Sequence, residues 1–134
     1  MDPFVGTWEL DPATLHYERG RPGKRATYII EATSAGLLFS LDAEDADGKP
    51  IRFQYGGALD GTAQPLPGDS GLELVLMRES ERSISSILKL GDKELDRWTR
   101  ELSADGQSIT MTQFVSNPGG PDFRNKSVYR RVER

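Results

Sequence analysis

Side chains capable of metal, redox or nucleophilic chemistry are scarce in this sequence. It contains one histidine, His16, and no cysteine among its 134 residues. Thiolate nucleophiles, disulfides, zinc–cysteine sites and iron–sulfur clusters are therefore excluded. No pattern of further ligands surrounds His16, so we expect no metal site and no cofactor. An axial bond to haem is the one cofactor role left to it, and a solvated histidine is favoured.

Polar side chains that alternate with apolar ones are stronger candidates for a binding site. Arg100 shares a strand face with Trp98 and Leu102, and burying an arginine is costly unless an anion accompanies it. If Arg100 points into an interior, it needs a carboxylate from the protein or from a ligand. A structural partner, or a position on the outer surface, is favoured. The candidate ligand-binding residues are Tyr55, Trp98, Arg100, Met111 and Tyr129.

Three short stretches carry weaker signals. Residues 44–48, EDADG, space carboxylates somewhat like a calcium loop but lack its later bidentate glutamate, so a hairpin turn is favoured. Residues 61–71, GTAQPLPGDSG, lack the lysine of a phosphate-binding loop and predict a loop or a lid at a barrel mouth. Residues 18–25, ERGRPGKR, are basic, and a solvated loop is favoured over an anion site.

Short strands separated by turns must position these residues. Turn dipeptides recur along the chain, as at Asp47-Gly48 and Asp105-Gly106, and the glycine accepts the positive φ of a tight hairpin. The runs between them alternate apolar and polar residues with the two-residue period of a strand. We therefore predict an all-β protein, an antiparallel up-and-down barrel of about eight to ten strands, with a two-sheet sandwich as the alternative. Residues 11–19 are expected to form a loop or a single helical turn.

Several of these strands also carry apolar residues on the face opposite their main apolar stripe. A barrel interior that holds a ligand is often lined by such a mixture of groups, so these positions are candidate lumen residues. A barrel filled by its own side chains, or a dimer interface, explains them equally well. The residues are Val75, Met77, Ile87, Trp98, Leu102, Val128 and Val132.

Composition and charge narrow the classes of function. Seventeen Lys and Arg against 21 Asp and Glu give a net charge of −4, without the basic surplus that nucleic acid requires. The first residues, MDPFVGTW, lack a signal-peptide pattern, and no stretch has the roughly 20 apolar residues of a membrane helix. We expect a single cytoplasmic domain, residues 1–134, with no nucleic-acid or membrane partner. A secreted or periplasmic protein whose signal peptide had been removed would have the same sequence.

The Gly-x-Trp at residues 6–8 resembles the first-strand motif of lipocalins and their calycin relatives. The stretches FVGTWELDPAT, DADGKPIRFQYGGALDGTAQPLPG, TRELSADGQSITMT and NKSVYRRV resemble a group of small bacterial lipocalin-like proteins of undefined function. The resemblance covers nearly the whole chain. It implies a lipocalin-like barrel that Gly6 and Trp8 close at one end, with Arg130 or Arg131 packed over the Trp8 ring. Such a cation–π contact contributes about 0.5–1 kcal/mol.

Fatty-acid-binding proteins, also calycins, hold a carboxylate with an Arg-x-Tyr triplet near the last strand. The aligned triplet here is Ser127, Val128 and Tyr129, so the arginine is missing. The resemblance therefore does not extend to that fatty-acid site.

Three classes of function remain. The first is a binding protein that holds a small apolar or amphipathic molecule, with one polar or anionic end, in a barrel lumen. The second is a solid barrel with a structural or interaction role, as a monomer or a homodimer. The third, ranked last, is an isomerase or cyclase acting on apolar substrates. Without cysteine and with one histidine, its acids and bases would be Asp, Glu, Tyr, Lys and Arg, and no catalytic residue is assigned.

Overall fold

Ten β-strands form a single antiparallel sheet in the computed structural model, which describes residues 2–18, 21–66, 70–115 and 123–132. Within these residues no helix is long and apolar enough to cross a membrane. The strands are β1 (Gly6–Tyr17), β2 (Arg25–Ala32), β3 (Leu37–Glu44), β4 (Pro50–Gly57), β5 (Asp60–Pro65), β6 (Leu72–Ser80), β7 (Ser83–Leu90), β8 (Lys93–Leu102), β9 (Ser108–Val115) and β10 (Phe123–Arg131).

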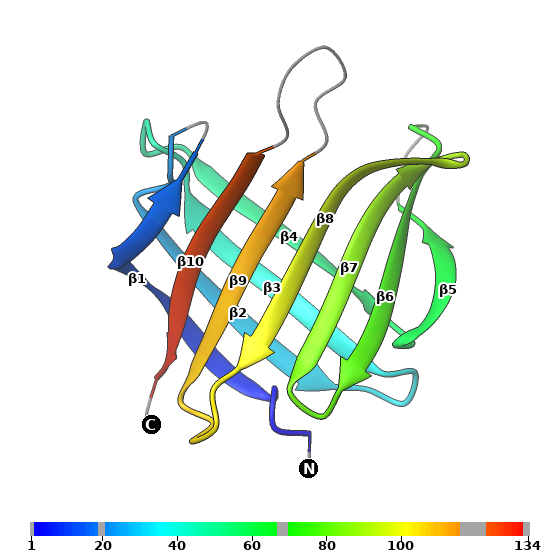
Figure 1. Ribbon diagram of the computed structural model, residues 1–134, viewed down its shortest axis with the longest axis horizontal. Coiled ribbons are helices and arrows are strands. Elements are labelled where there is room, and N and C mark those ends of the chain that lie inside the picture. Colours follow the sequence, from blue (N-terminus) through cyan, green and yellow to red (C-terminus); the bar gives the residue numbers. More distant parts are fainter. Residues whose placement is uncertain (1, 19–20, 67–69, 116–122, 133–134) are drawn as a thin grey trace.

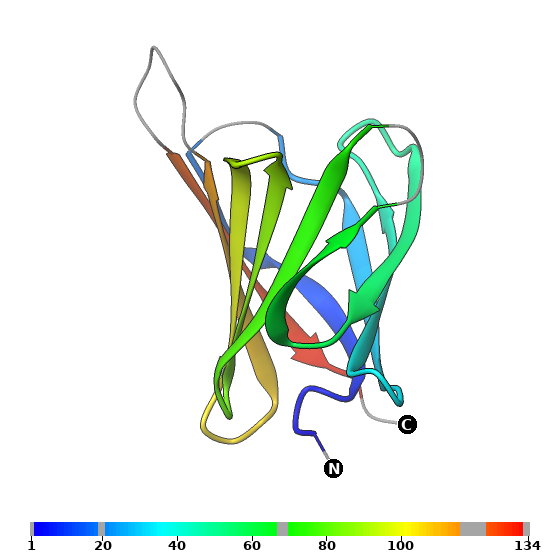
Figure 2. The same cartoon turned by 90° about the vertical axis from the view of Figure 1, so that its right-hand side faces the viewer.

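The sheet curls into a nearly closed barrel because its first and last strands pair. The strand order is β4-β3-β2-β1-β10-β9-β8-β7-β6-β5, so β1 and β10 lie at its centre. Figure 1 shows β6 to β10 in front of β2 to β4, and Figure 2 shows the barrel from the side of β5. Strands β4 and β5 are the two edges, joined by the chain but not by a ladder of hydrogen bonds. The predicted up-and-down barrel is confirmed, and the sandwich alternative is wrong.

The β3–β4 turn uses its carboxylates to hold the backbone. The side chain of Asp45 accepts hydrogen bonds from the backbone N–H groups of Asp47 and Lys49, each at 2.9 Å. Gly48 has a φ of +83°, a conformation that a side chain would strain. The EDADG stretch therefore forms a hairpin turn, as favoured over a calcium loop.

Strand β1 extends further than the sequence indicated. Its pairing with β10 shifts register after Asp11, where Pro12 has no N–H to donate. Thr14 bridges the irregularity, since its hydroxyl donates to the Asp11 carbonyl (2.6 Å) and accepts from the Val128 N–H (2.9 Å). The expectation of a loop or helical turn over residues 11–19 is therefore wrong for the part of that stretch the structure describes.

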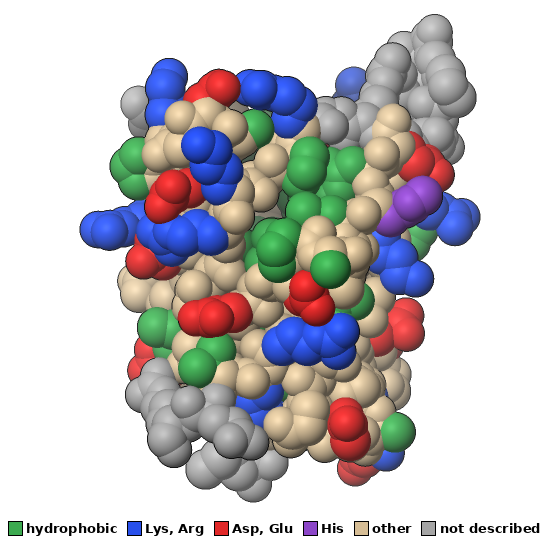
Figure 3. Space-filling model, turned by 90° about the vertical axis from the view of Figure 1, so that its left-hand side faces the viewer, with side chains coloured by type: hydrophobic (Ala, Val, Ile, Leu, Met, Phe, Trp, Pro, Cys, Tyr) green, Lys and Arg blue, Asp and Glu red, His purple; other side chains and the backbone are tan. Residues whose placement is uncertain are grey.

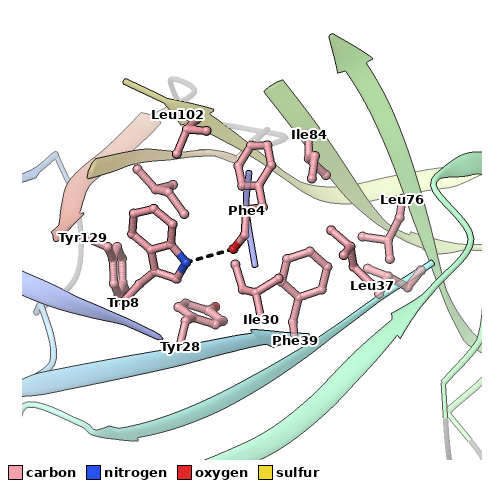
Figure 4. Packing of buried hydrophobic residues seen from close by; sticks show 12 residues of the cluster. Phe4, Trp8, Tyr28, Ile30, Leu37, Phe39, Leu76, Ile84, Leu102 and Tyr129 are labelled. Carbon is pink, nitrogen blue, oxygen red and sulfur yellow. Dashed lines mark hydrogen bonds between the residues drawn. The ribbon is translucent and has the colours of Figure 1, made fainter. Parts of the chain in front are cut away.

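Large apolar side chains fill the end of the barrel at which β1 begins. Phe4, from the segment before β1, and Trp8 are completely buried, and the indole N–H of Trp8 donates to the Phe4 carbonyl at 3.0 Å (Figure 4). Burying each such side chain contributes about 1.5–3 kcal/mol to folding. The cluster comprises Phe4, Trp8, Tyr28, Ile30, Leu37, Phe39, Leu74, Leu76, Ile84, Leu102, Ile109 and Tyr129.

In β6 and β7 the residues of the main apolar stripe face the lumen. The residues on the opposite face, Val75, Met77 and Ile87, point outward. Leu74 and Leu76 are buried, whereas Met77 is 37% exposed. Val75 and Ile87 lie opposite each other in the ladder, on the same outer face as Met77. The prediction that these three line the lumen is wrong, because both faces of these strands carry apolar residues and alternation alone does not tell inside from outside.

Two of the other mixed-face residues do point inward. Trp98 and Leu102 lie on the face of β8 that carries the buried Arg100. Val128 alternates with the buried Ser127 and Tyr129 and so lies on the outer face of β10. Val132 follows the end of β10 and is outside the strand.

The outer surface carries interspersed charges of both signs. Arg25 of β2 pairs with Glu44 (2.6 Å) and Asp42 (3.2 Å) of β3. Figure 3 shows the same mixture of acidic and basic side chains on the left-hand face, with His16 exposed among them. This face therefore has no uniformly basic patch.

Candidate functional site

A cavity of about 570 Å³ lies inside the barrel, next to the apolar cluster. Phe53 faces this cavity and is nevertheless 49% exposed, so the cavity is open to solvent at the β4 edge. Most of the wall is apolar or aromatic. The lining residues are Tyr28, Leu41, Phe53, Gln54, Tyr55, Leu66, Leu74, Ser86, Leu88, Trp98 and Arg100.

Arg100 of β8 is the charged group in this wall, and only 3% of it is exposed. Its Nη1 donates to the Ser86 hydroxyl of β7 at 2.9 Å, and its Nη2 donates to the Tyr55 hydroxyl of β4. Its Nε has no hydrogen-bond partner. Among the residues the structure describes, no other buried side-chain nitrogen or oxygen lacks one. A buried N–H without an acceptor costs about 1–3 kcal/mol, so the protein leaves this group incompletely satisfied.

Aromatic rings support the Arg100 guanidinium. Its central carbon lies 4.9 Å from the Phe39 ring centroid and 5.6 Å from that of Tyr55. These two rings stack on each other with centroids 5.0 Å apart and planes inclined by 10°. Cation–π contacts hold the guanidinium in place without neutralising its charge.

No negative charge of the described residues compensates Arg100. Seven ion pairs occur in this part of the chain, and Arg100 belongs to none of them. Burial raises the pKa of Tyr55 well above its usual 10.0, although Arg100 acts in the opposite direction. Tyr55 is therefore a neutral phenol at pH 7: its oxygen accepts from Arg100, and its O–H donates to the Tyr28 oxygen at 3.5 Å.

The structure brings together three of the five candidate ligand-binding residues. Tyr55, Trp98 and Arg100 line the cavity. Met111 packs against the apolar cluster, and Tyr129 is buried within it, edge-on to Tyr28 with ring centroids 5.3 Å apart. Met111 and Tyr129 therefore contribute to packing in this structure and not to the cavity wall.

Sequence reasoning did not single out most of the remaining lining residues. Ser86 is the most informative of these, because its hydroxyl is an acceptor for Arg100. A buried serine in an apolar strand was the available signal, but its proximity to Arg100 depends on the pairing of β7 with β8. Phe53 shares the alternating face of Tyr55 and could have been found from that pattern.

The closed end of the barrel has a different arginine. Arg131 lies over the Trp8 ring at 4.2 Å and donates to the carbonyls of Gly106 (3.0 Å), Val5 (2.9 Å) and Pro3 (2.8 Å). Of the two arginines left open by the sequence, Arg131 is thus the one over Trp8.

Arg130 and Gly6 were the other two residues expected at this end of the barrel. Arg130 lies on the outer face and pairs with Asp11 at 3.2 Å. Gly6 has a φ of +149°, and a Cβ there would lie 2.5 Å from Nη1 of Arg131. Glycine at this position therefore leaves the room that the guanidinium occupies.

The remaining motifs lie away from the cavity or only partly inside the described residues. The first five residues of the GTAQPLPGDSG stretch, 61–65, belong to strand β5, where a loop was expected, and Leu66 lines the cavity. Residues 67–69 lie outside the described residues, so a lid there stays a prediction. In the basic stretch, residues 19–20 are likewise outside, and Arg21 pairs with Asp47 at 2.9 Å. No group of three potential metal ligands occurs in the described ranges.

Comparisons with known proteins support the fold assignment. No protein-family model matches the chain, and no curated protein matches it. Solved structures of two point mutants of the fluorescent protein UnaG match with TM-scores of 0.67, at 18% and 17% identity. The alignments cover 98% of this chain and 98% and 97% of theirs. Wild-type UnaG matches with a TM-score of 0.61 and 17% identity, over 96% of this chain and 97% of its own.

These likenesses, at low sequence identity, concern the fold. The described residues form an all-β barrel of ten antiparallel strands, and the alignments with the UnaG structures extend over nearly the whole chain. The lumen of this barrel is open to solvent.

Proposed function

We propose that this protein binds a small, mainly apolar molecule with one anionic end inside its barrel. The observation that carries the proposal is the buried guanidinium of Arg100, which lines the cavity and has no carboxylate partner within the part of the chain that the structure describes. A ligand anion there would supply the missing charge and an acceptor for the free Nε–H.

The apolar part of the ligand would lie against the other walls of the cavity. Leu74, Leu88, Trp98 and Phe53 supply this surface from four different strands. A volume of about 570 Å³ falls within the range of roughly 300–1,000 Å³ usual for small-molecule sites. A small amphipathic molecule therefore fits both the size and the chemistry of the lumen.

The proposal also includes the protein family, the cellular location and the oligomeric state. The protein would be a small bacterial lipocalin-like protein with one domain, residues 1–134, working in the cytoplasm as a monomer or a homodimer. Support comes from the order and spacing of the sequence motifs and from the contact of Arg131 with the buried Trp8 ring.

A fluorescent-dye displacement assay tests the proposed function. Anilinonaphthalene sulfonate, an anionic apolar dye, should brighten on binding, and dodecanoate should displace it far better than dodecyltrimethylammonium. Substituting Arg100→Met should weaken dodecanoate binding at least about tenfold, equivalent to about 1.4 kcal/mol. The matched control is Arg97→Met on the same strand, because Arg97 faces outward and pairs with Glu94 at 2.7 Å.

Two results would overturn the proposal. One is a lumen from which no dye is displaced by any amphipathic probe. The other is equal affinity for dodecanoate in the Arg97→Met and Arg100→Met variants, which would remove Arg100 from the site.

A further inference from the structure

The lumen face of β8 carries an acid, an aromatic ring and a base at alternate positions: Asp96, Trp98 and Arg100. From Asp96 to Leu102 the strand pairs with β9 without a register shift, so the three side chains share one face. Trp98 and Arg100 both line the cavity. Asp96 therefore points toward the same interior, one step nearer the start of β8.

The neighbours of Asp96 place it beside the cavity wall. It lies opposite Leu88 of β7, which is itself a lining residue. The Gln113 side chain of β9 hydrogen-bonds to its carboxylate. The Oε1 of Gln113 accepts from the Asn125 side chain at 3.3 Å, and Asn125 is 9% exposed. Asp96 thus belongs to a polar group on the inner surface of β8, β9 and β10.

Asp96 is half-buried and has no cationic partner among the described residues. None of the seven ion pairs includes it. Burial raises the pKa of its carboxyl, although the hydrogen bond from Gln113 acts in the opposite direction. Among the described residues, the interior therefore contains an acid, Asp96, and a base, Arg100, that lack an oppositely charged partner.

The two charges are too far apart to neutralise each other directly. Four residues of strand, at about 3.3–3.4 Å each, separate the Asp96 and Arg100 backbones by about 13 Å. An ion pair requires about 4 Å or less between its charged atoms. A ligand lying along β8 can reach both groups at once.

We propose that the preferred ligand is bipolar, with an anionic end at Arg100, an ammonium or N–H donor end at Asp96, and an apolar middle against Trp98. This inference rests on the proposed function and adds the second end of the ligand. An ionised carboxylate only accepts hydrogen bonds, so Asp96 complements a donor. It also repels a second anion, and the same residue therefore selects against ligands with two acidic ends.

A series of linear probes tests the bipolar site in the wild-type protein. Displacement of anilinonaphthalene sulfonate should give tighter binding of ω-aminododecanoate than of dodecanoate, by about fivefold or more. Dodecanedioate should bind more weakly than dodecanoate. The short ω-aminohexanoate should gain nothing over hexanoate, because it cannot span the two charges.

The variant Asp96→Asn then tests whether Asp96 is the residue that binds the amino group. It should bring ω-aminododecanoate and dodecanoate to within about twofold of each other. The control is Glu101→Gln, an exposed acid on the outer face of the same strand, which should keep the wild-type preference. Thermal unfolding of each variant checks that it is folded.

The outcomes separate this inference from the proposed function. If dodecanoate binds through Arg100 but the amino group brings no gain, or the gain survives in Asp96→Asn, the bipolar site is wrong and the proposed function stands. If neither probe binds, the proposed function itself is wrong.

Discussion

Two arginine–aromatic contacts occupy different parts of this barrel, and their hydrogen bonds differ. At the closed end, Arg131 covers Trp8 and donates to three backbone carbonyls. In the lumen, Arg100 lies over Phe39 and Tyr55 but leaves its Nε without an acceptor. Each nitrogen of the Arg131 guanidinium donates to a backbone carbonyl, whereas Arg100 keeps one N–H available for a further hydrogen bond.

This difference indicates how to separate a structural arginine from a ligand-binding one. Backbone carbonyls are fixed by the sheet, so an arginine that satisfies them ties strands and termini together. Hydroxyl partners such as Ser86 and Tyr55 carry no charge, and they orient Arg100 without neutralising it. Stability should therefore depend on the closed end, and ligand affinity on the lumen.

The largest effect on stability is expected at Trp8. Replacing this completely buried ring in Trp8→Ala should lower the free energy of unfolding by about 3–5 kcal/mol, since it removes packing and leaves a cavity. Urea denaturation followed by circular dichroism measures it. Trp98→Ala is the matched control and should cost clearly less, because Trp98 already borders a cavity. Equal losses would contradict the distinction between the two ends.

Arg131→Met should lower the free energy of unfolding by about 2 kcal/mol. Three carbonyls lose a charged donor, and hydrogen bonds to charged groups contribute about 1.5–3 kcal/mol each before partial exposure reduces this. The neighbouring Arg130→Met should change stability by less than about 0.5 kcal/mol, because its ion pair with Asp11 is on the surface. The same urea experiment compares the two, and similar losses would rule out Arg131 as the closing residue.

Arg100→Met should leave the free energy of unfolding within about 1 kcal/mol of the wild type. Replacing an incompletely satisfied buried charge by an apolar side chain of similar length is often neutral or stabilising. Thermal and urea unfolding without ligand test this, alongside the loss of dodecanoate affinity expected from the same variant. A destabilisation as large as that of Arg131→Met would make Arg100 a structural residue as well.

The smallest effect concerns alkaline pH. Burial raises the pKa of Tyr17, Tyr55 and Tyr129 above the usual 10.0. Above about pH 10 the unfolded chain loses these protons while the native protein keeps them, so stability declines as pH rises toward the native pKa values. Urea midpoints between about pH 9 and 11 measure the decline. Tyr129→Phe should make it shallower than in the wild type, and an unchanged slope would contradict this.

The barrel was predictable from local signals, since turn dipeptides and two-residue alternation both act between near neighbours. The same alternation placed Arg100 on one strand face with Trp98 and Leu102, but it did not show that this face points inward, and a structural partner or an outer position was favoured. The extension of β1 past Pro12 was not predictable, since a threonine hydroxyl replaces part of the ladder there. A local sequence pattern carries no sign of that cross-strand contact.

The composition of the lumen was harder to predict than the barrel around it. Ser86 and Tyr28 meet Arg100 or Tyr55 only because particular strands pair in a particular register. Val75 and Ile87 were assigned to the wrong face because their strands are apolar on both sides. The choice between Arg130 and Arg131 likewise required knowing that Tyr129 is buried, which places Arg131 on the inner face.

The pairing of β1 with β10 has a consequence for the order of folding. Eight of the nine strand pairings join strands consecutive in the chain, whereas this one joins the first strand to the last. The hydrogen bond from Arg131 to the Val5 carbonyl closes a loop of 126 residues, and such closure loses more chain entropy than any hairpin. We expect hairpins to form early and the Trp8–Arg131 contact late. Arg131→Met should then speed unfolding more than it slows refolding.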